Sequence, residues 1–261
     1  MFSKCVLFCN TIFAPKIIII PNKNDTFPCQ NPSTLALAAS AVAADPVSAN
    51  IVGYTKVSVG AISLIGPMFT DVNAGVASLQ LGSIMPNENY NDDGSDVIQF
   101  LNPDGSLDFA AVYYGADWGW FSGETGWVND HDIDLGTGFM VFTESQDVEY
   151  LIAGEVNTAP IEVAVAQGVA VIGNGLPVII TLDQLIPDEN YNDDGSDVIQ
   201  FLNPDGSLDF AAVYYGEDWG WFSGEKDWVN EEELKPGKCV FATIETAGGV
   251  VFSLPELVIA E

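Results

Sequence analysis

The sequence predicts an all-β, mostly antiparallel protein of two tandem small domains, each a β-sandwich or a partly open β-barrel with short helical turns. Two observations predict this class. The 28 residues ENYNDDGSDVIQFLNPDGSLDFAAVYYG occupy 88–115 and return unchanged at 189–216. Apolar and polar residues also alternate with a period of two in several short runs, and Gly, Pro, Asn and Asp separate these runs, as in strands joined by turns.

The repeat extends beyond this segment and divides the chain. Residues 118–124 and 127–129 recur at 219–225 and 228–230, and weaker similarity joins 57–66 to 163–173 and 136–142 to 237–243. Each copy is therefore about 100 residues long, a common size for a domain. We expect an export leader at 1–44, a first β domain at 45–156 and a second at 157–261, with the connection near 154–162.

The elements of the first copy follow in order. Apolar and polar residues alternate at 54–59, which predicts a strand. The run SLQLGSIMP at 78–86, matched by TLDQLIP at 181–187, predicts a short helical turn. The runs 96–102 and 107–114 predict an antiparallel hairpin, because Asn102-Pro103-Asp104-Gly105 places proline where a type I turn needs it and glycine where a left-handed residue forms a bulge. Closing strands are expected at 138–145 and 148–156.

The first 44 residues differ from the rest and indicate export. The small and apolar run PSTLALAASAVAAD at 32–45 contains Ala41-Val42-Ala43, which has the form that signal peptidase cleaves, so we expect cleavage after Ala43 or Ala44. The apolar runs are too short for a transmembrane segment. The upstream part fits either a long leader or an extension from a start codon assigned too early. We expect an exported bacterial protein, secreted or on the cell surface.

Charge and cysteine content limit the partners and the chemistry. The chain has 37 acidic residues against seven lysines and a formal net charge of −30, so nucleic acid and anionic membranes are excluded as partners. Cations, neutral glycans or a salty medium fit, and the acids form either a solvated face or metal sites. Cys239 is the one cysteine after the leader, which predicts a buried, inert thiol, with a catalytic nucleophile as the alternative.

The order of features in each copy carries a resemblance. A strand is followed by an SLIG-type glycine turn at 63–66, a D-x-I-Q-F strand at 96–100, the aromatic hairpin, Gly-Trp and the G-x-G-F run at 136–139, all behind an export signal. This arrangement resembles the repeated domains of secreted or surface proteins from environmental bacteria, over residues 50–261. The resemblance implies no established activity. Cys239 in place of glycine and Ala170 in place of the SLIG serine depart from it.

The tract NYNDDGSD predicts either a calcium loop or a turn. Oxygen-bearing side chains alternate around a glycine, as in calcium loops, but position twelve is Phe100 where a bidentate glutamate is expected. Asp and Asn tracts also form turns through local hydrogen bonds. No cofactor other than Ca²⁺ is expected. The candidate Ca²⁺ ligands are Asn89, Asn91, Asp93 and Asp96, and Asn190, Asn192, Asp194 and Asp197.

The aromatic segments predict either a sugar platform or a core. All six tryptophans lie at 118–127 and 219–228, and we expect Trp118 and Trp120 to project from one strand face beside Tyr113. Exposed aromatic rings bind the apolar faces of sugars, whereas buried rings fill the core of a small sandwich. The candidate glycan-binding residues are Tyr113, Trp118, Trp120, Tyr214, Trp219 and Trp221.

No enzyme is expected, because His131 is the only histidine and no zinc or phosphate motif occurs. Acid pairs such as Asp117 and Glu124 fit a glycoside hydrolase as a remote alternative, but 37 acids always provide such pairs. The sequence therefore favours an exported structural or adhesive β-repeat protein of the cell surface or extracellular matrix. The alternative is a glycan-binding module, and calcium-stabilised folding is compatible with either. The expected partners are extracellular glycans or other surface proteins.

Overall fold

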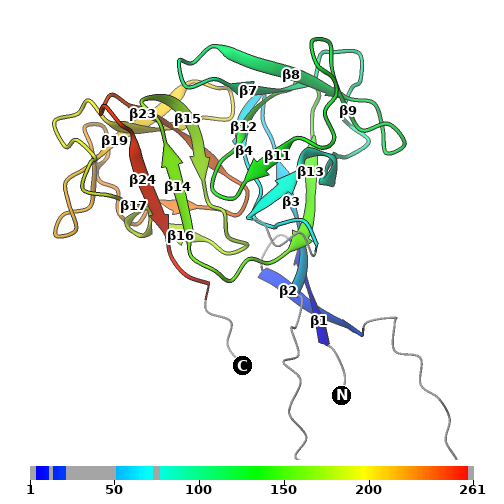
Figure 1. The fold of residues 1–261 in the computed structure, drawn as a ribbon, viewed down its shortest axis with the longest axis horizontal. Helices are drawn as coiled ribbons and strands as arrows, with labels where there is room; N and C mark the ends of the chain where they lie inside the picture. Colours follow the sequence, from blue (N-terminus) through cyan, green and yellow to red (C-terminus); the bar gives the residue numbers. More distant parts are fainter. Residues whose placement is uncertain (1–3, 12–13, 22–50, 73–76, 258–261) are drawn as a thin grey trace, which may run out of the picture.

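The computed structural model describes residues 4–11, 14–21, 51–72 and 77–257. Within these ranges the protein is all-β, and its only helices are the short 3-10 turns η1 (Leu81–Ser83) and η2 (Leu182–Gln184), which confirms the predicted fold class. Every strand pair is antiparallel except β1 with β3, and none of the sheets formed by the described strands closes into a barrel. The domains are therefore sandwich-like. Figure 1 shows the two sets of sheets side by side.

Copy 1, together with two strands of the segment that precedes it, forms two larger sheets and a two-stranded one. The first sheet has the order β2-β1-β3-β13-β6, the second has the order β10-β9-β8-β7-β12-β4, and β11 pairs with β5. The bounds are β1 Lys4–Thr11, β2 Ala14–Pro21, β3 Ile51–Ser58, β4 Ile62–Ile65, β5 Ser78–Gln80, β6 Ile84–Pro86, β7 Val97–Leu101, β8 Leu107–Tyr113, β9 Trp120–Ser122, β10 Gly126–Trp127, β11 Asp132–Asp134, β12 Phe139–Phe142 and β13 Glu149–Glu155.

Copy 2 repeats this pairing with its own strands. The orders are β14-β24-β17, β15-β23-β18-β19-β20-β21 and β16-β22. The bounds are β14 Ile161–Val165, β15 Gly168–Gly173, β16 Ile180–Thr181, β17 Ile186–Pro187, β18 Val198–Leu202, β19 Leu208–Tyr214, β20 Trp221–Ser223, β21 Asp227–Trp228, β22 Glu233–Leu234, β23 Cys239–Ile244 and β24 Val250–Leu254. Each strand from β3 to β13 thus has a counterpart from β14 to β24.

The repeated segment forms the predicted hairpin in both copies. Ile98 pairs with Ala111 and Phe100 with Phe109, and the register shifts after Phe100. Gly105 has a φ of 79°, a backbone conformation that glycine adopts without strain, so it makes the bulge possible. The turn closes through the bond from the Asn102 N–H to the Ser106 carbonyl, at 2.8 Å.

Each copy has its own apolar core, centred on a tryptophan. Trp120 and Tyr150 are fully buried in copy 1, and Trp221 and Phe252 are fully buried in copy 2. The Trp120 indole N–H donates to the carbonyl of Ile84 at 2.8 Å, so the polar end of this ring is satisfied inside the core. The two cores explain how each copy of about 100 residues buries enough apolar surface to fold.

The copies contact each other through a pseudo-twofold set of backbone bonds. The Gly66 N–H donates to the Gly237 carbonyl at 3.2 Å, and its counterpart Gly173 donates to Gly136 at 2.9 Å. Further out, the hairpin turn of each copy docks on the other, because Ile62 donates to the Pro204 carbonyl at 3.2 Å and Val169 donates to the Pro103 carbonyl at 2.6 Å. The Asn-Pro-Asp-Gly turns therefore close their own hairpins and also join the two copies.

Cys239 lies at the centre of this contact, at the position that Gly138 holds in copy 1. A Cβ placed on Gly138 would lie 2.8 Å from the Cys239 Sγ, and one on Gly173 would lie 2.5 Å from it. Burial raises the pKa of the Cys239 thiol to about 12, so the thiol stays protonated and unreactive at neutral pH. As a residue Cys239 is only half-buried, less than the sequence predicts, whereas the raised pKa of its thiol agrees with the inert thiol that the sequence favours.

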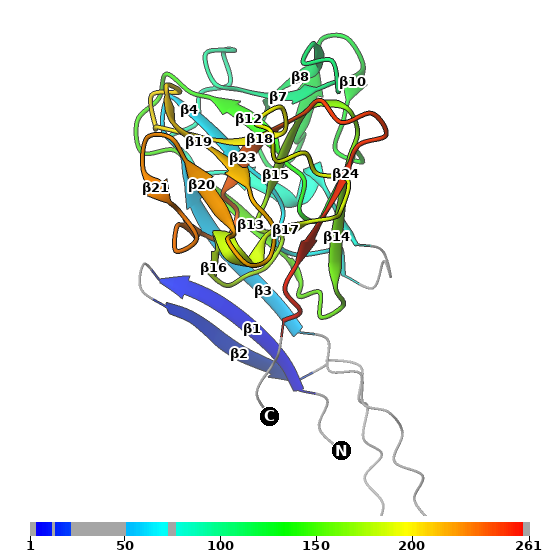
Figure 2. The same cartoon turned by 90° about the vertical axis from the view of Figure 1, so that its left-hand side faces the viewer.

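Strands β1 and β2 come from the segment predicted as an export leader. β1 pairs antiparallel with β2 and parallel with β3 (Figure 2). The expected cleavage site after Ala43 or Ala44 lies outside the described residues. Within the described ranges there is no helix with the length and hydrophobicity that crossing a bilayer requires.

Candidate binding site

The structure separates the six predicted glycan-binding residues into a buried and an exposed group. Tyr113, Trp120, Tyr214 and Trp221 are buried, and the two tryptophans have no exposed surface at all. Trp118 and Trp219 are each 63% exposed. The prediction of one exposed face shared by Trp118 and Trp120 is therefore wrong, because a ring enclosed in the core cannot also meet a ligand.

The backbone at Gly119 explains this separation. Gly119 has a φ of 76°, and β9 begins only at the next residue. Trp118 thus lies in a turn, so it does not share the alternation of the strand. Within the sheet, Tyr113 pairs with Trp120, and both face the core. The outer face consequently carries the neighbouring residues, Tyr114 and Phe121.

These outer residues form an exposed aromatic cluster in copy 1, defined here as Tyr114, Trp118, Phe121 and Trp127. Trp118 and Trp127 are stacked, with ring centroids 5.7 Å apart and an interplanar angle of 22°. Trp127 also meets Phe121 edge to face at 5.1 Å and Tyr114 at 6.3 Å. Trp127 is 48% exposed, so two indole rings face the solvent together.

Copy 2 contains the same cluster, defined as Tyr215, Trp219, Phe222 and Trp228. Trp219 and Trp228 stack at 5.7 Å with an angle of 24°, and Trp228 meets Phe222 at 5.2 Å and Tyr215 at 6.4 Å. The two clusters therefore agree closely in composition, geometry and exposure. The sequence contained a signal for Tyr114, which the prediction missed. The alternation in DFAAVYY places Tyr114 on the face of the sheet opposite to that of Tyr113.

Hydrogen bonds fix the turn that carries Trp118. The Asn129 side chain accepts from the Trp120 N–H at 2.6 Å and donates to the Trp118 carbonyl at 2.9 Å. A Cβ on Gly119 would lie 2.1 Å from the Asn129 Oδ1, so only glycine permits this approach. Asn230 makes the same two bonds in copy 2, at 2.7 and 3.0 Å. The exposed rings thus sit on a backbone that is already ordered.

The predicted calcium ligands are engaged with their own backbone. Asp96 is fully buried, and its carboxylate accepts from the Asn91 N–H at 2.8 Å, the Thr143 hydroxyl at 2.6 Å, and the Glu144 and Ser145 N–H groups at 2.9 and 3.2 Å. Burial alone would raise the pKa of Asp96, but the hydrogen bonds outweigh it and leave the pKa below its ordinary value. Asp96 therefore ties the 91–96 loop to the turn between β12 and β13.

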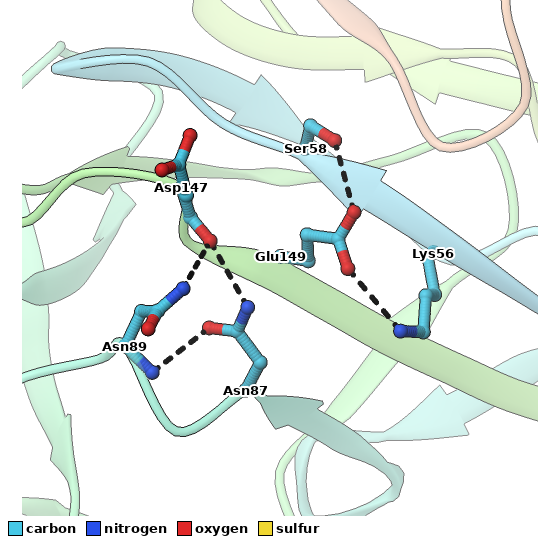
Figure 3. A network of polar contacts seen from close by, with 6 residues as sticks. All are labelled: Lys56, Ser58, Asn87, Asn89, Asp147 and Glu149. Carbon is cyan, nitrogen blue, oxygen red and sulfur yellow. Dashed lines mark hydrogen bonds and ion pairs between the residues drawn. The ribbon is translucent and has the colours of Figure 1, made fainter. Parts of the chain in front are cut away.

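The remaining candidates of copy 1 form consecutive local turns. The Asn91 side chain accepts from the Asp93 N–H at 3.2 Å, and Asp93 accepts from the Ser95 N–H at 2.9 Å, which lowers the Asp93 pKa. Asn89 donates to the Asp147 carbonyl at 2.9 Å (Figure 3). Asn89 is thus held against the β12–β13 turn.

In copy 2, Asp197 accepts from Asn192, Glu245 and Thr246 in the same way as Asp96. Asn192 and Asp194 repeat the local turns, and Asn190 donates to the Asp188 carboxylate. Across the part of the chain that the structure describes, no three or more His, Cys, Asp or Glu side chains are grouped as metal ligands would be. The geometry supports the turn interpretation of both tracts.

A cleft of about 620 Å³ opens beside the cluster of copy 1. Tyr114 and Leu151 line it, together with Lys56 and Glu149, whose Nζ and Oε2 atoms form an ion pair at 3.2 Å (Figure 3). The strand registers place Glu162 and Val251 at the equivalent positions of copy 2, so this pair is not repeated. The Lys56–Glu149 ion pair of the cleft therefore occurs only in copy 1, whereas an aromatic cluster occurs in each copy.

Comparison with protein-family models, with curated proteins and with solved structures finds no match to this chain. The candidate function therefore depends on the geometry of the two clusters.

Proposed function

We propose that the protein is a non-catalytic structural or adhesive β-repeat protein of the cell surface or extracellular matrix, exported by its leader, that binds through its two aromatic clusters. One observation carries this proposal: the same four aromatic side chains, with the same stacking and exposure, occur on both copies. Other surface proteins and extracellular glycans are the partners that such clusters fit.

Exposed aromatic surface supports binding because it is costly to leave in water. Full burial of one large apolar side chain contributes about 1.5–3 kcal/mol, and tryptophan and tyrosine are enriched at the centres of interfaces. The turns at Asn129 and Asn230 already order the backbone beneath the rings, so binding loses less conformational entropy than it would with a flexible loop. Two such sites on one chain further strengthen attachment to a repetitive surface through multivalency.

The packing of the single histidine, His131, supports a role without catalysis. His131 lies with its ring centroid 4.6 Å from that of Phe100 and 4.9 Å from that of Phe109, so its contacts are those of a packed aromatic ring. The equivalent position in copy 2 is Glu232, which separates this side chain from the repeated features.

Binding is tested by sedimentation of the protein with bacterial cell envelopes and insoluble matrix material. We expect the variant with all four exposed tryptophans changed to alanine (Trp118, Trp127, Trp219 and Trp228) to remain in the supernatant while the native chain sediments. The control replaces the exposed residues Leu107 and Leu208 with alanine, which lie outside the clusters. Equal sedimentation of all three proteins, with unchanged melting temperatures, would rule out the clusters as binding sites.

A glycan-binding module is the second candidate, favoured by the paired indole faces of Trp118 and Trp127. Sugars place their C–H groups on such faces. We expect soluble polysaccharide to change the fluorescence of the exposed tryptophans but not that of the buried Trp120 and Trp221. The double variant Trp118→Phe with Trp219→Phe should show a smaller fluorescence change on addition of polysaccharide. A fluorescence change as large as that of the native protein would contradict this candidate.

A further inference from the structure

The two clusters lie at opposite ends of the molecule. Strands β4 and β15 are edge strands beside the contact between the copies, whereas β10 and β21 are the edge strands at the far end of each sheet. Figure 1 shows β9 on one side and β19 on the other, and Figure 2 again places β10 opposite β20 and β21. The clusters belong to these outer strands, so they face two different neighbours.

The contact between the copies holds the clusters in this arrangement. Among the described residues, four backbone hydrogen bonds cross it in two pseudo-equivalent pairs, and the Lys238 Nζ adds a bond to the Ser58 carbonyl at 2.7 Å. Gly60 and Gly168 allow close backbone approach there, since a Cβ on Gly60 would meet the Pro204 carbonyl oxygen of the other copy and one on Gly168 would meet the Pro103 carbonyl oxygen. A pair of sites fixed in this way is suited to bridging two partners.

The surroundings of the clusters favour a positively charged partner. Asp117 and Asp218 are exposed and directly precede Trp118 and Trp219 in the sequence, in a chain with a net charge of −30. Aromatic faces and carboxylates both attract ammonium groups. Copy 2 provides an internal example, because the Lys226 Nζ lies 2.7 Å from the Asp209 carboxylate and 3.9 Å from the centroid of the Phe210 ring.

We infer that the protein cross-links chains of an amine-bearing polysaccharide, one chain at each aromatic cluster. The sugar rings stack on the exposed indoles, and the ammonium groups lie near the flanking carboxylates. This inference rests on the proposed binding function and adds to it the class of partner and a bridging geometry.

The test uses chitosan, a soluble polymer of glucosamine, and a short glucosamine oligomer. We expect the native protein to make chitosan solutions turbid. Trp118→Ala with Trp127→Ala, and separately Trp219→Ala with Trp228→Ala, should abolish turbidity, while the affinity of the intact cluster for the oligomer stays within about twofold because the sites are distant. The variant that combines all four changes keeps every charge, so it controls for nonspecific association of a polyanion with a polycation.

The outcomes separate this inference from the proposed function. Turbidity that persists in the fourfold variant, or in either one-cluster variant, would overturn the cross-linking inference. Equal binding of a fully acetylated, neutral oligomer, or binding of polylysine without the glucosamine oligomer, would overturn the assigned partner class. In each case the proposed function stands if the fourfold variant still fails to sediment with cell envelopes, and it fails if that variant sediments normally.

Discussion

Replacing Asp96 with alanine removes the acceptor that joins two loops of copy 1. The buried carboxylate receives four hydrogen bonds, from Asn91 in its own loop and from Thr143, Glu144 and Ser145 in the turn between β12 and β13. The exchange leaves these donors without their acceptor. We expect copy 1 to lose stability while its overall pairing is retained.

The magnitude follows from the burial of each donor. A hydrogen bond to a charged group contributes about 1.5–3 kcal/mol, but water can replace the bonds of donors near the surface. Only the Thr143 bond is fully buried, and the three backbone bonds are partly buried. We therefore expect a loss of about 3–4 kcal/mol, well below the sum of four full contributions. At about 4–8 °C per kcal/mol for a domain of this size, the melting temperature of copy 1 should fall by roughly 12–32 °C.

Thermal unfolding followed by near-ultraviolet circular dichroism measures this loss, with two matched variants. Asp96→Asn keeps an acceptor for the β12–β13 turn but opposes its amide to the Asn91 N–H, so it should lose about 1–2 kcal/mol. Asp93→Ala removes one exposed bond to Ser95, which water can replace, and should lose much less stability than Asp96→Ala. If Asp96→Ala loses no more than Asp93→Ala, the structural role assigned to Asp96 is wrong.

The same variants test acid sensitivity and calcium. Because the folded-state pKa of Asp96 is lowered, its contribution is present above the unfolded pKa of about 3.9 and is lost as the pH falls through the folded pKa. Asp96→Asn should therefore show a weaker decline in stability under acid. Millimolar CaCl₂ should raise the melting temperature no more than NaCl of equal ionic strength; a specific rise that Asp96→Ala abolishes would restore the calcium interpretation.

Three further results are expected. Trp120→Phe should lose about 2–4 kcal/mol of unfolding free energy by denaturant titration, because it deletes core volume and the bond to the Ile84 carbonyl; a loss below about 0.5 kcal/mol would contradict burial of this ring. Gly119→Ala should increase acrylamide quenching and weaken cluster binding, since its Cβ would overlap the Asn129 side chain, whereas unchanged quenching would show that the turn is not fixed by this contact. Cys239 should react with a thiol reagent only after unfolding, owing to its raised pKa, and rapid labelling of the native protein would refute this.

The sequence predicted strands and turns well because their determinants are local. The alternation in 96–102 and 107–114 and the turn at Asn102-Pro103-Asp104-Gly105 required only neighbouring residues, and the hairpin, its bulge and both helical turns follow the prediction. The separation of the buried Trp120 from the exposed Trp118 was not predicted, since it depends on the positive φ of Gly119 and on Asn129. A period-two pattern holds only within one strand, and β9 begins at Trp120, so Trp118 lies outside the strand whose alternation the prediction used.

The contact between the copies could not be predicted from local pattern. It depends on which edges of two separately folded sheets meet, and the sequence showed only the repeated glycines and the turn. The structure shows that Gly66 and Gly173 donate backbone hydrogen bonds across the contact, and that Pro103 and Pro204 act as acceptors for the other copy. These residues have roles at long range that a turn signal alone does not reveal.

One geometry accounts for where the copies agree and where they differ. The Asn-Pro-Asp-Gly turns dock away from the pseudo-twofold axis, so neither turn meets its own counterpart. Each turn instead accepts a bond from the equivalent strand of the other copy, at Ile62 or Val169, and two identical turns therefore fit equally well. Near the axis, position 138 faces its counterpart 239, and a Cβ on Gly138 would meet both the Cys239 Sγ and the Ile65 carbonyl oxygen of its own copy, so two side chains do not fit there.

The aromatic clusters fall outside this explanation. They lie on the outer strands, far from the contact, and their exposed indoles add little to either core. Packing therefore explains the repeated turn but not the repeated pair of exposed tryptophans, and this difference is the physical reason for proposing that the clusters bind a partner.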